Sequence, residues 1–230
     1  MRVWPVVLLL FAFSLAAKES NSWVSFAPGN LQSMGHWVDQ SQHPLNVSHH
    51  YFTFGKLDAG MGVGWTHSWK VKLEFSNVSS DGVAFRAVVR QGNGEAPPII
   101  FSRSKAVGAG DGLNVWQPYI GRDILEQDAS GHWIYRSTSD GKIWKFDESG
   151  SLLSISSLKG WSYLFENDDK GRLRKVTNAF GRQLNFQYAQ EGRLESLLLP
   201  DGNSIKYAYD ERGRLSSIAI SEKVLHRFDY

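Results

Sequence analysis

The chain has 230 residues, and its 25 Lys and Arg against 23 Asp and Glu give a formal net charge of only +2. So weak a charge offers no electrostatic case for nucleic-acid binding. The chain has no cysteine, which excludes disulfides and cysteine-ligated zinc. Its 9 Trp, 8 Tyr and 13 Phe are too many for a disordered protein.

The first residues have the pattern of a secretory signal peptide. Arg2 precedes an apolar run over residues 3–15, and small residues follow at Ala16 and Ala17. The run is shorter than the roughly 20 residues that cross a bilayer, so a membrane anchor is the less favoured alternative. We expect cleavage of residues 1–16 and export to the periplasm, the cell surface or the medium, with no membrane span in the mature chain.

Residues 17–130 show no clean period and predict an irregular all-β domain. Four runs have strand composition between turn-forming residues: 48–54, 68–75, 83–90 and 99–102. The glycine-rich segment 60–64 lacks both the GxGxxG spacing and the following helix of a nucleotide-binding loop. We expect these glycines to allow close backbone packing beneath Trp65 and Trp69.

Histidines and aspartates concentrate in the same part of the chain, and both residue types can bind zinc. Their spacing matches neither HExxH nor HxH, so we expect solvated or packed histidines and no metal. The residues concerned are His36, His43, His49, His50, His67, Asp39 and Asp58.

The sequence also lacks the signatures of an enzyme. It has no GxSxG elbow and no cysteine nucleophile. The acidic pairs Asp168-Asp169 and Asp210-Glu211 recur at turns, where turn geometry explains them better than catalysis does. We therefore predict no catalytic residue, no cofactor and no enzymatic activity.

Residues 131–230 repeat with a period of 21. Each copy predicts two strands with a turn at either end, because alternating runs such as 204–209 are followed by turn chemistry such as Asp210 to Gly213. The recurring columns are Gly150, Gly171, Gly192 and Gly213; Leu152, Leu173, Leu194 and Leu215; Ile155, Val176, Leu197 and Ile218; and Phe146, Asn167, Tyr188, Tyr209 and Tyr230.

One spacing conflicts with simple strand alternation. Leu215 and Ile218 are three residues apart, as are their counterparts in every copy, so a regular strand would place them on opposite faces. Either the second strand of each copy contains a bulge or it is buried on both faces.

An aromatic ladder recurs at the same period and is the candidate site of the repeat region. Its rings suit either a continuous core between neighbouring copies or a stack that binds sugar rings, and the core interpretation is favoured because repeats bury one face against their neighbours. Arg172, Arg193 and Arg214 form a basic stripe that we expect to be solvated. The ladder residues are Trp144, Phe165, Phe186, Tyr207 and Phe228.

Tyr209-Asp210 followed by Gly213-Arg214-Leu215 has the form YDxxGRL and resembles the YD repeat, also called the RHS repeat. The segment Gly62 to Trp69 resembles the GxGWxhs segment that precedes such repeats in RHS and wall-associated proteins. The resemblance implies spiralling β-sheets, which in large members close into a hollow shell around a C-terminal toxin or effector. Some repeats of the family are described as binding carbohydrate.

We therefore expect an all-β chain with an irregular β domain that leads into an open spiralling sheet of 21-residue hairpin repeats. The expected divisions are residues 1–16, 17–130 and 131–230, with an incomplete last copy. The resemblance implies an exported scaffold of a toxin or effector delivery system, without a toxin domain of its own. The alternative is an exported carbohydrate-binding module at the cell envelope. The open edge at Tyr230 predicts either a partner chain or further repeats of a longer protein.

Overall fold

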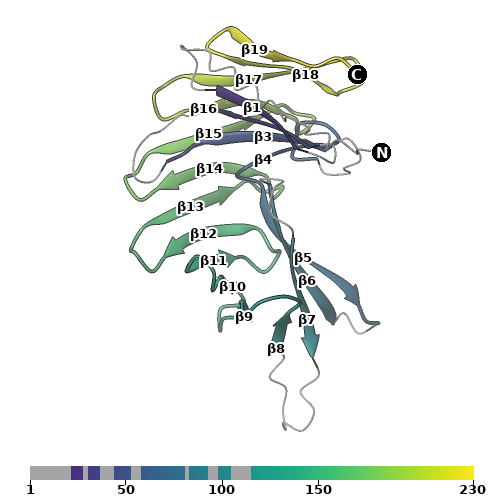
Figure 1. Ribbon diagram of the computed structural model, residues 1–230, viewed down its shortest axis with the longest axis vertical. Helices are drawn as coiled ribbons and strands as arrows, with labels where there is room; N and C mark the ends of the chain where they lie inside the picture. Colours follow the sequence, from purple (N-terminus) through teal and green to yellow (C-terminus); the bar gives the residue numbers. More distant parts are fainter. Residues whose placement is uncertain are drawn as a thin grey trace, which may run out of the picture.

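The computed structural model describes residues 22–27, 31–36, 44–52, 58–80, 83–92, 98–104 and 115–230 (Figure 1). These residues contain nineteen strands and no helix, which confirms the predicted all-β class. The expected signal peptide, residues 1–16, lies outside the described residues. Within the described part, no helix is long and apolar enough to cross a membrane.

A small antiparallel sheet is built by the first four strands in chain order. It contains β1 (Ser22–Ala27), β2 (Leu31–His36), β3 (Val47–Phe52) and β4 (Trp65–His67). Only β3 was predicted from the sequence, over residues 48–54. The segment between β3 and β4 brings the glycine-rich stretch to the end of this sheet, where it meets the repeats.

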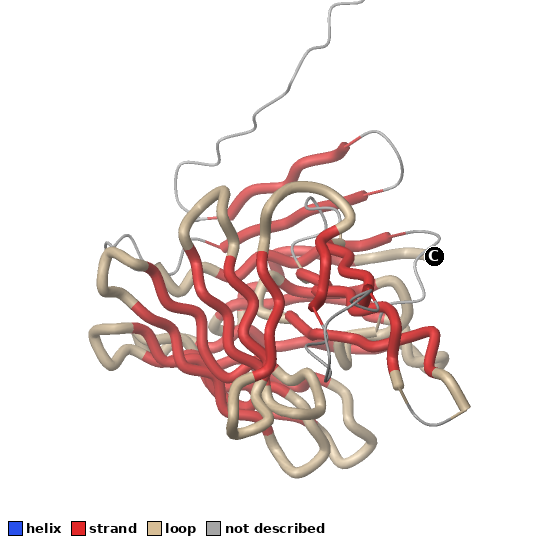
Figure 2. The backbone as a smooth tube through the Cα atoms, turned by 90° about the horizontal axis from the view of Figure 1, so that it is seen from below, coloured by secondary structure: helices blue, strands red, loops and turns tan. Residues whose placement is uncertain are grey.

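The remaining fifteen strands form one long antiparallel sheet in chain order, and the turns gather at the two ends of the strands (Figure 2). The strands are β5 (Val71–Val78), β6 (Ala84–Gln91), β7 (Ile99–Ser104), β8 (Val115–Pro118), β9 (Ile124–Gln127), β10 (Trp133–Arg136), β11 (Lys142–Phe146), β12 (Leu152–Ser157), β13 (Ser162–Asn167), β14 (Leu173–Asn178), β15 (Gln183–Tyr188), β16 (Leu194–Leu198), β17 (Ser204–Tyr209), β18 (Leu215–Ile220) and β19 (Lys223–Arg227). This sheet runs without interruption across residues 130 and 131, where we expected a domain boundary.

The long sheet coils until its first strand meets its middle. Lys72 on β5 makes an isolated antiparallel bridge with Ser151, and the backbone N–H of Leu73 donates a 2.9 Å hydrogen bond to the carbonyl of Gly150. No continuous ladder joins these strands, so the coil touches itself and the sheet stays open. The sheet therefore coils on itself, as the predicted spiralling sheet requires.

Turns of one kind close both ends of the hairpins. In the turn after β17, the N–H of Asp210 bonds the carbonyl of Arg214 at 2.9 Å, and the N–H of Gly213 bonds the carbonyl of Asp210 at 2.9 Å. Gly213 has a φ of +77°, as the last residue of a three-residue hairpin loop requires. The same pair of bonds recurs in the turns at Asp128, Asp147, Ser157, Asp168, Asn178, Ala189 and Leu199.

A bulge in the second strand of each repeat resolves the spacing conflict. Tyr209 pairs with Leu215 but Ala208 pairs with Ser217, so Ser216 is an extra residue in β18. The extra residue returns Leu215 and Ile218 to the same face, where both are fully buried. Matching shifts occur in β12, β14 and β16, so the alternative of a strand buried on both faces is wrong.

The last hairpin departs from the common turn. Ile220 pairs directly with Lys223, which leaves a two-residue loop of Ser221 and Glu222 at φ values of +46° and +73°. Such loops favour Gly, which has no Cβ, and Asn, whose short polar side chain can hydrogen-bond locally, because other side chains are strained at positive φ. This turn stands where Lys223 interrupts the 21-residue recurrence of Gly160, Gly181 and Gly202.

Glu222→Gly should therefore increase the free energy of unfolding by about 1 kcal/mol, because it relieves a left-handed non-glycine residue. Urea denaturation of the full chain measures the change. Gly202→Ala is the matched control at the corresponding turn of the preceding copy. It should destabilise the protein, because Gly202 has a φ of +87°. A neutral or destabilising Glu222→Gly would contradict the strain argument.

Candidate functional site

The aromatic ladder lies inside the core rather than on the surface. Four of its five side chains are buried, with exposed fractions of 6% for Trp144, 5% for Phe165, 3% for Phe186 and 7% for Tyr207. Phe228 is half-buried against the same core cluster. A ring with this little exposed area has no open face on which a sugar could stack.

Most ladder rings are covered by side chains that precede the repeats. Trp69 lies 6.1 Å from Phe165, and His67 lies 5.2 Å from Phe186, measured between ring centroids. His49 Nε2 is 2.8 Å from the Tyr207 hydroxyl, and the tilted ring of Trp65 lies 4.7 Å from that of Phe228. Trp144 meets Tyr135, its partner on the adjacent strand β10, at 5.8 Å. The early strands and the repeats therefore share one core.

Residues 58–69 form a segment that we call the glycine clamp, and one carboxylate organises its first turn. Oδ1 of Asp58 accepts hydrogen bonds from the backbone N–H groups of Gly60, Met61 and Gly62 at 2.8, 3.0 and 3.1 Å. These three bonds hold the glycines in left-handed conformations, with φ of +83° at Gly60 and +92° at Gly62. Asp58 thus positions this loop.

The clamp packs its glycines against the turn glycines of two successive repeats. A Cβ at Gly60 would lie 3.2 Å from the carbonyl oxygen of Gly192, and one at Gly62 would lie 3.2 Å from that of Gly213. The carbonyl of Gly60 also accepts a 2.7 Å hydrogen bond from the N–H of Leu194. The glycines of the clamp thus pack closely against the backbone of the repeat array, whereas the sequence predicted close packing beneath Trp65 and Trp69.

Tyrosine hydroxyls connect each repeat to the one before it. Tyr188 donates to the carbonyl of Leu173 at 3.0 Å, Tyr209 to Leu194 at 2.6 Å and Tyr230 to Leu215 at 2.9 Å. Each bond spans 15 residues and satisfies a carbonyl at the start of the preceding copy's second strand. We call these bonds the tyrosine staples.

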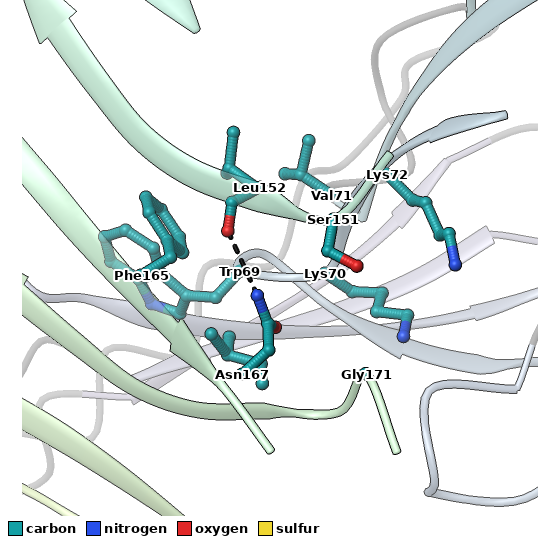
Figure 3. Close-up of a pocket in the computed structure, with 10 residues that line it drawn as sticks. Trp69, Lys70, Val71, Lys72, Ser151, Leu152, Phe165, Asn167 and Gly171 are labelled. Atoms are coloured by element: carbon teal, nitrogen blue, oxygen red, sulfur yellow. Dashed lines mark hydrogen bonds between the residues drawn. The ribbon is translucent and has the colours of Figure 1, made fainter. Parts of the chain in front are cut away.

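Asn167 replaces tyrosine in the earliest staple and makes the same connection. Its side-chain nitrogen donates to the carbonyl of Leu152 at 3.2 Å (Figure 3). The shorter side chain leaves a cavity of about 20 Å³ between Trp69, Lys70 and Gly171. Asn167, an exception in the sequence column, is therefore an equivalent of tyrosine in hydrogen bonding but not in volume.

The arginines of the stripe are half-buried, so they are partly solvated and partly packed on tyrosine rings. Arg172 lies over the ring of Tyr188 at 4.6 Å, Arg193 over Tyr209 at 5.1 Å and Arg214 over Tyr230 at 4.6 Å. The turn brings each guanidinium onto the staple of the following copy, a contact that the sequence did not predict. Arg193 has Ala189 in place of the turn aspartate and donates instead to the carbonyl of Gly213.

Aspartates fix the guanidinium groups in the two copies that keep the DxxGR sequence. Arg172 Nε donates to Asp168 Oδ2 at 2.7 Å, and Arg214 Nε donates to Asp210 Oδ2 at 2.7 Å. The backbone N–H and then the guanidinium of Arg214 hold the pKa of Asp210 below its usual range. The recurrent carboxylates therefore have structural partners, in agreement with the prediction that turn geometry explains them.

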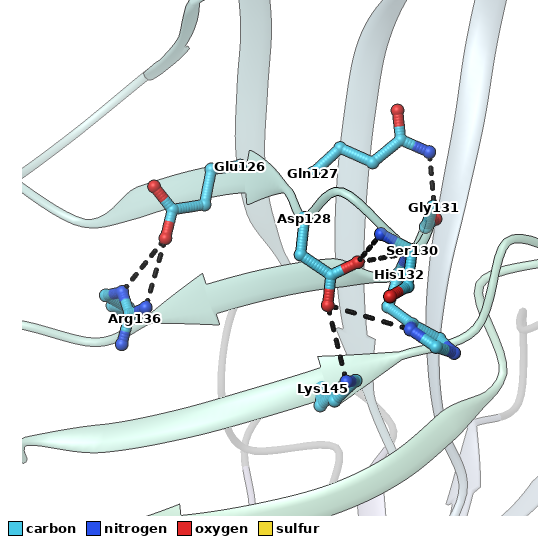
Figure 4. Close-up of polar contacts among 8 residues, drawn as sticks. All are labelled: Glu126, Gln127, Asp128, Ser130, Gly131, His132, Arg136 and Lys145. Atoms are coloured by element: carbon cyan, nitrogen blue, oxygen red, sulfur yellow. Dashed lines mark hydrogen bonds and ion pairs between the residues drawn. The ribbon is translucent and has the colours of Figure 1, made fainter.

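The same aspartate turn occurs once before the predicted repeats. Oδ1 of Asp128 accepts the N–H groups of Ser130 and His132 at 2.9 Å, and its other oxygen lies 3.3 Å from Lys145 (Figure 4). Its glycine is Gly131, 19 residues before Gly150, so the 21-residue period misses it. The DxxG pattern alone would have found this turn.

Three of the expected histidines lie between the small sheet and the repeats. His49, His50 and His67 are at most 2% exposed. His50 Nε2 lies 2.9 Å from the hydroxyl of Ser48, whereas neither ring nitrogen of His67 has a hydrogen-bond partner among the described residues. No group of three metal-ligating side chains occurs in the described ranges. His43 and Asp39 lie outside them, and His36 is described only by its backbone.

Burial favours the neutral imidazole at His50 and His67. Desolvation lowers the pKa of His50 to about 4. At His67 desolvation, assisted by the charges of Lys70 and His50, lowers the pKa to about 3. The histidines therefore contribute packing at neutral pH and oppose folding when acid forces protons onto the chain.

Comparisons with known proteins agree with this repeat geometry. Residues 135–230 match the family described as Teneurin YD-shell. No curated protein matches the chain. Among solved structures, a chain of the crystal structure titled TcdB2-TccC3-Cdc42 matches with a TM-score of 0.32 and 12% identity, over 86% of this chain and 11% of that one. The chain thus spans about a tenth of that solved chain.

Tyr209→Phe should lower the free energy of unfolding by about 1–2 kcal/mol, because the carbonyls of Leu194 and Gly60 lose their shared hydroxyl donor. Urea denaturation measures the loss. Tyr119→Phe is the matched control, since Tyr119 is 76% exposed, and it should change stability by less than about 0.5 kcal/mol. Equal effects of the two substitutions would contradict the staple.

Stability should decrease as the pH falls from 6.5 toward 4, by about 1.4 kcal/mol per pH unit for each of His50 and His67. The unfolded chain binds protons on these histidines from pH 6.5 downward, while the folded chain does not until its lower pKa is reached. Urea titrations at several pH values measure the slope. His67→Phe should reduce that slope, and an unchanged slope would contradict the assignment.

Proposed function

Because residues 135–230 belong to the RHS/YD-repeat family, we propose that the chain is an exported, non-catalytic scaffold that builds part of a shell wall. The observation that carries this proposal is the way each repeat is held to the next, by a tyrosine staple and a stacked arginine. Such nearest-neighbour contacts favour extension of the sheet over formation of a reaction site.

The glycine clamp supports the same role. It crosses two successive copies, and its Trp65 donates a 2.8 Å hydrogen bond to the hydroxyl of Tyr230. A segment that contacts several turns at once stabilises the curvature of the wall at the copies that contain Gly192, Gly213 and Tyr230. The finer function that we propose is a wall segment of a toxin or effector delivery system.

The alternative of a carbohydrate module on the aromatic ladder has little support from the geometry. Trp144 and Tyr207 are 6% and 7% exposed, and protein side chains cover their neighbours on the ladder. We infer that the ladder serves as core. Its replacement by alanine should cost about 3–5 kcal/mol in folding free energy, with no separate effect on ligand binding.

A photo-cross-linking amino acid at Val224 tests the scaffold. Val224 is 43% exposed on β19, an edge strand of the long sheet, where the next strand of a wall would pair. Expressed in producing cells, the protein should be exported and should cross-link to a polypeptide that mass spectrometry identifies as YD repeats or their cargo. The same amino acid at Ile120, 83% exposed on another turn, is the control.

A chain that is retained in the cytoplasm, or that cross-links equally from positions 224 and 120, would contradict the proposal.

A further inference from the structure

The long sheet has two ends, and the glycine clamp packs on one of them. Because neighbouring strands are antiparallel and follow chain order, the turns after β8, β10, β12, β14 and β16 all lie at the same end. The turns after β12 and β14 lie side by side at the left of Figure 1. The clamp contacts Gly192 and Gly213, in the turns after β15 and β17, so it packs on the opposite end.

Exposed apolar side chains concentrate on the turns of the first end. In the turn after β8, Tyr119 is 76% and Ile120 is 83% exposed. Leu158, after β12, is 84% exposed, and Phe180, after β14, is 60% exposed. These are four of the five most exposed large apolar side chains among the described residues, and Val63 of the clamp is the other. Such a grouping indicates an interaction surface, whereas a single exposed leucine would not.

We call the turns 119–123, 157–161 and 178–182 the apolar rim, and each of them also carries a cation. The cation follows the last apolar tip residue within two positions, and the three are Arg122, Lys159 and Arg182. The one carboxylate in these turns is Asp123, which accepts hydrogen bonds from the hydroxyl of Tyr135 and the N–H of Thr138 at 2.8 Å. The turns at the opposite end differ, because each of them contains at least one aspartate or glutamate.

The other turns at this end limit the rim. Asp140, in the turn after β10, is paired with Lys142 at 2.7 Å, so this turn adds no net charge. The turn after β16 contains Asp201 and no basic residue. The apolar and basic character therefore ends before the turn after β16.

The arrangement of the tips favours a lipid surface over a protein partner. Leu158 and Phe180 stand on turns two strands apart, which corresponds to about 10 Å at the spacing of β-strands. Separate apolar tips do not form the continuous apolar centre of a protein interface. At a bilayer surface, however, each apolar side chain can enter the boundary between headgroups and acyl chains by itself. A basic side chain beside it then lies at the level of the lipid phosphates, which it attracts.

We propose that the apolar rim binds the surface of a bilayer that contains anionic lipids. Ile120, Leu158 and Phe180 insert at the boundary between headgroups and acyl chains, and the neighbouring cations contact lipid phosphates. This function goes beyond the scaffold role and does not depend on it, since the tyrosine staples and the glycine clamp lie at the other end of the sheet. It would hold a wall segment against a membrane without crossing it.

The test is co-sedimentation of the protein, purified after export, with vesicles of phosphatidylcholine alone or of equal parts phosphatidylcholine and phosphatidylglycerol. We expect binding to the anionic vesicles, weaker binding to the neutral ones, and a decrease in binding as salt is added. Leu158→Ser and Lys159→Gln should each weaken binding to the anionic vesicles by about fivefold. Near-UV circular dichroism should stay unchanged, because both positions are exposed.

Two variants on the clamped end of the sheet are the matched controls. Val63→Ser removes an apolar side chain that is 71% exposed, and Arg212→Gln removes an exposed cation from the turn after β17. Arg212→Gln changes the net charge by the same amount as Lys159→Gln, so it controls for attraction that does not depend on the rim. Both controls should bind anionic vesicles as tightly as the unaltered protein.

The proposal is overturned if the anionic vesicles do not bind the protein, or if the two controls weaken binding as much as the rim variants do. It is also overturned if, without lipid, the unaltered protein is a dimer in analytical ultracentrifugation and Leu158→Ser is a monomer. That result would identify the rim as an interface between two copies of the chain. None of these outcomes changes the cross-linking expected at Val224, so the scaffold proposal is tested separately.

Discussion

The hairpin turns of the repeat array up to Gly213 each contain a glycine with positive φ, and the segments that precede the repeats pack directly on the backbone at three of them, Gly150, Gly192 and Gly213. A Cβ at Gly150 would lie 1.9 Å from the carbonyl oxygen of Leu73. A Cβ at Gly60 or at Gly62 would likewise lie 3.2 Å from the carbonyl oxygen of Gly192 or of Gly213, respectively. Gly150 therefore has two roles, because the residue that permits the left-handed turn also leaves room for another backbone, whereas at Gly192 and Gly213 the missing Cβ of Gly60 and Gly62 allows the close approach. The joint core depends on this row of contacts.

Two sets of interactions build on that row. Along the array, each staple joins a hydroxyl to a carbonyl of the preceding copy, and a guanidinium covers the ring. Across the array, Trp69, His67, His49 and Trp65 cover successive ladder rings. The first set links nearest neighbours only, as in other repeat proteins. The second set joins distant copies to one small sheet, so early and late strands should unfold together.

The burial of the aromatic ladder follows from this arrangement. Ladder and clamp bury their aromatic rings against each other, which explains why the most regular aromatic column is unsuited to ligand binding. The half-buried rings of Phe75 and Trp133 lie apart from the ladder, near the point where β5 leaves the turn at Gly150 and the sheet has not closed.

The sequence alone determined the period, the hairpins, the turn chemistry and the YD-repeat resemblance, because each depends on residues close together in the chain. It also narrowed the Leu215 and Ile218 spacing to two alternatives. Only the tertiary structure selected the bulge, since strand register depends on the partner strand. It alone showed that Arg172 stacks on Tyr188, that Asn167 acts as a staple and that the histidines are buried. Those contacts join residues from different copies or from opposite ends of the chain. The spacing of residues within one copy therefore does not predict them.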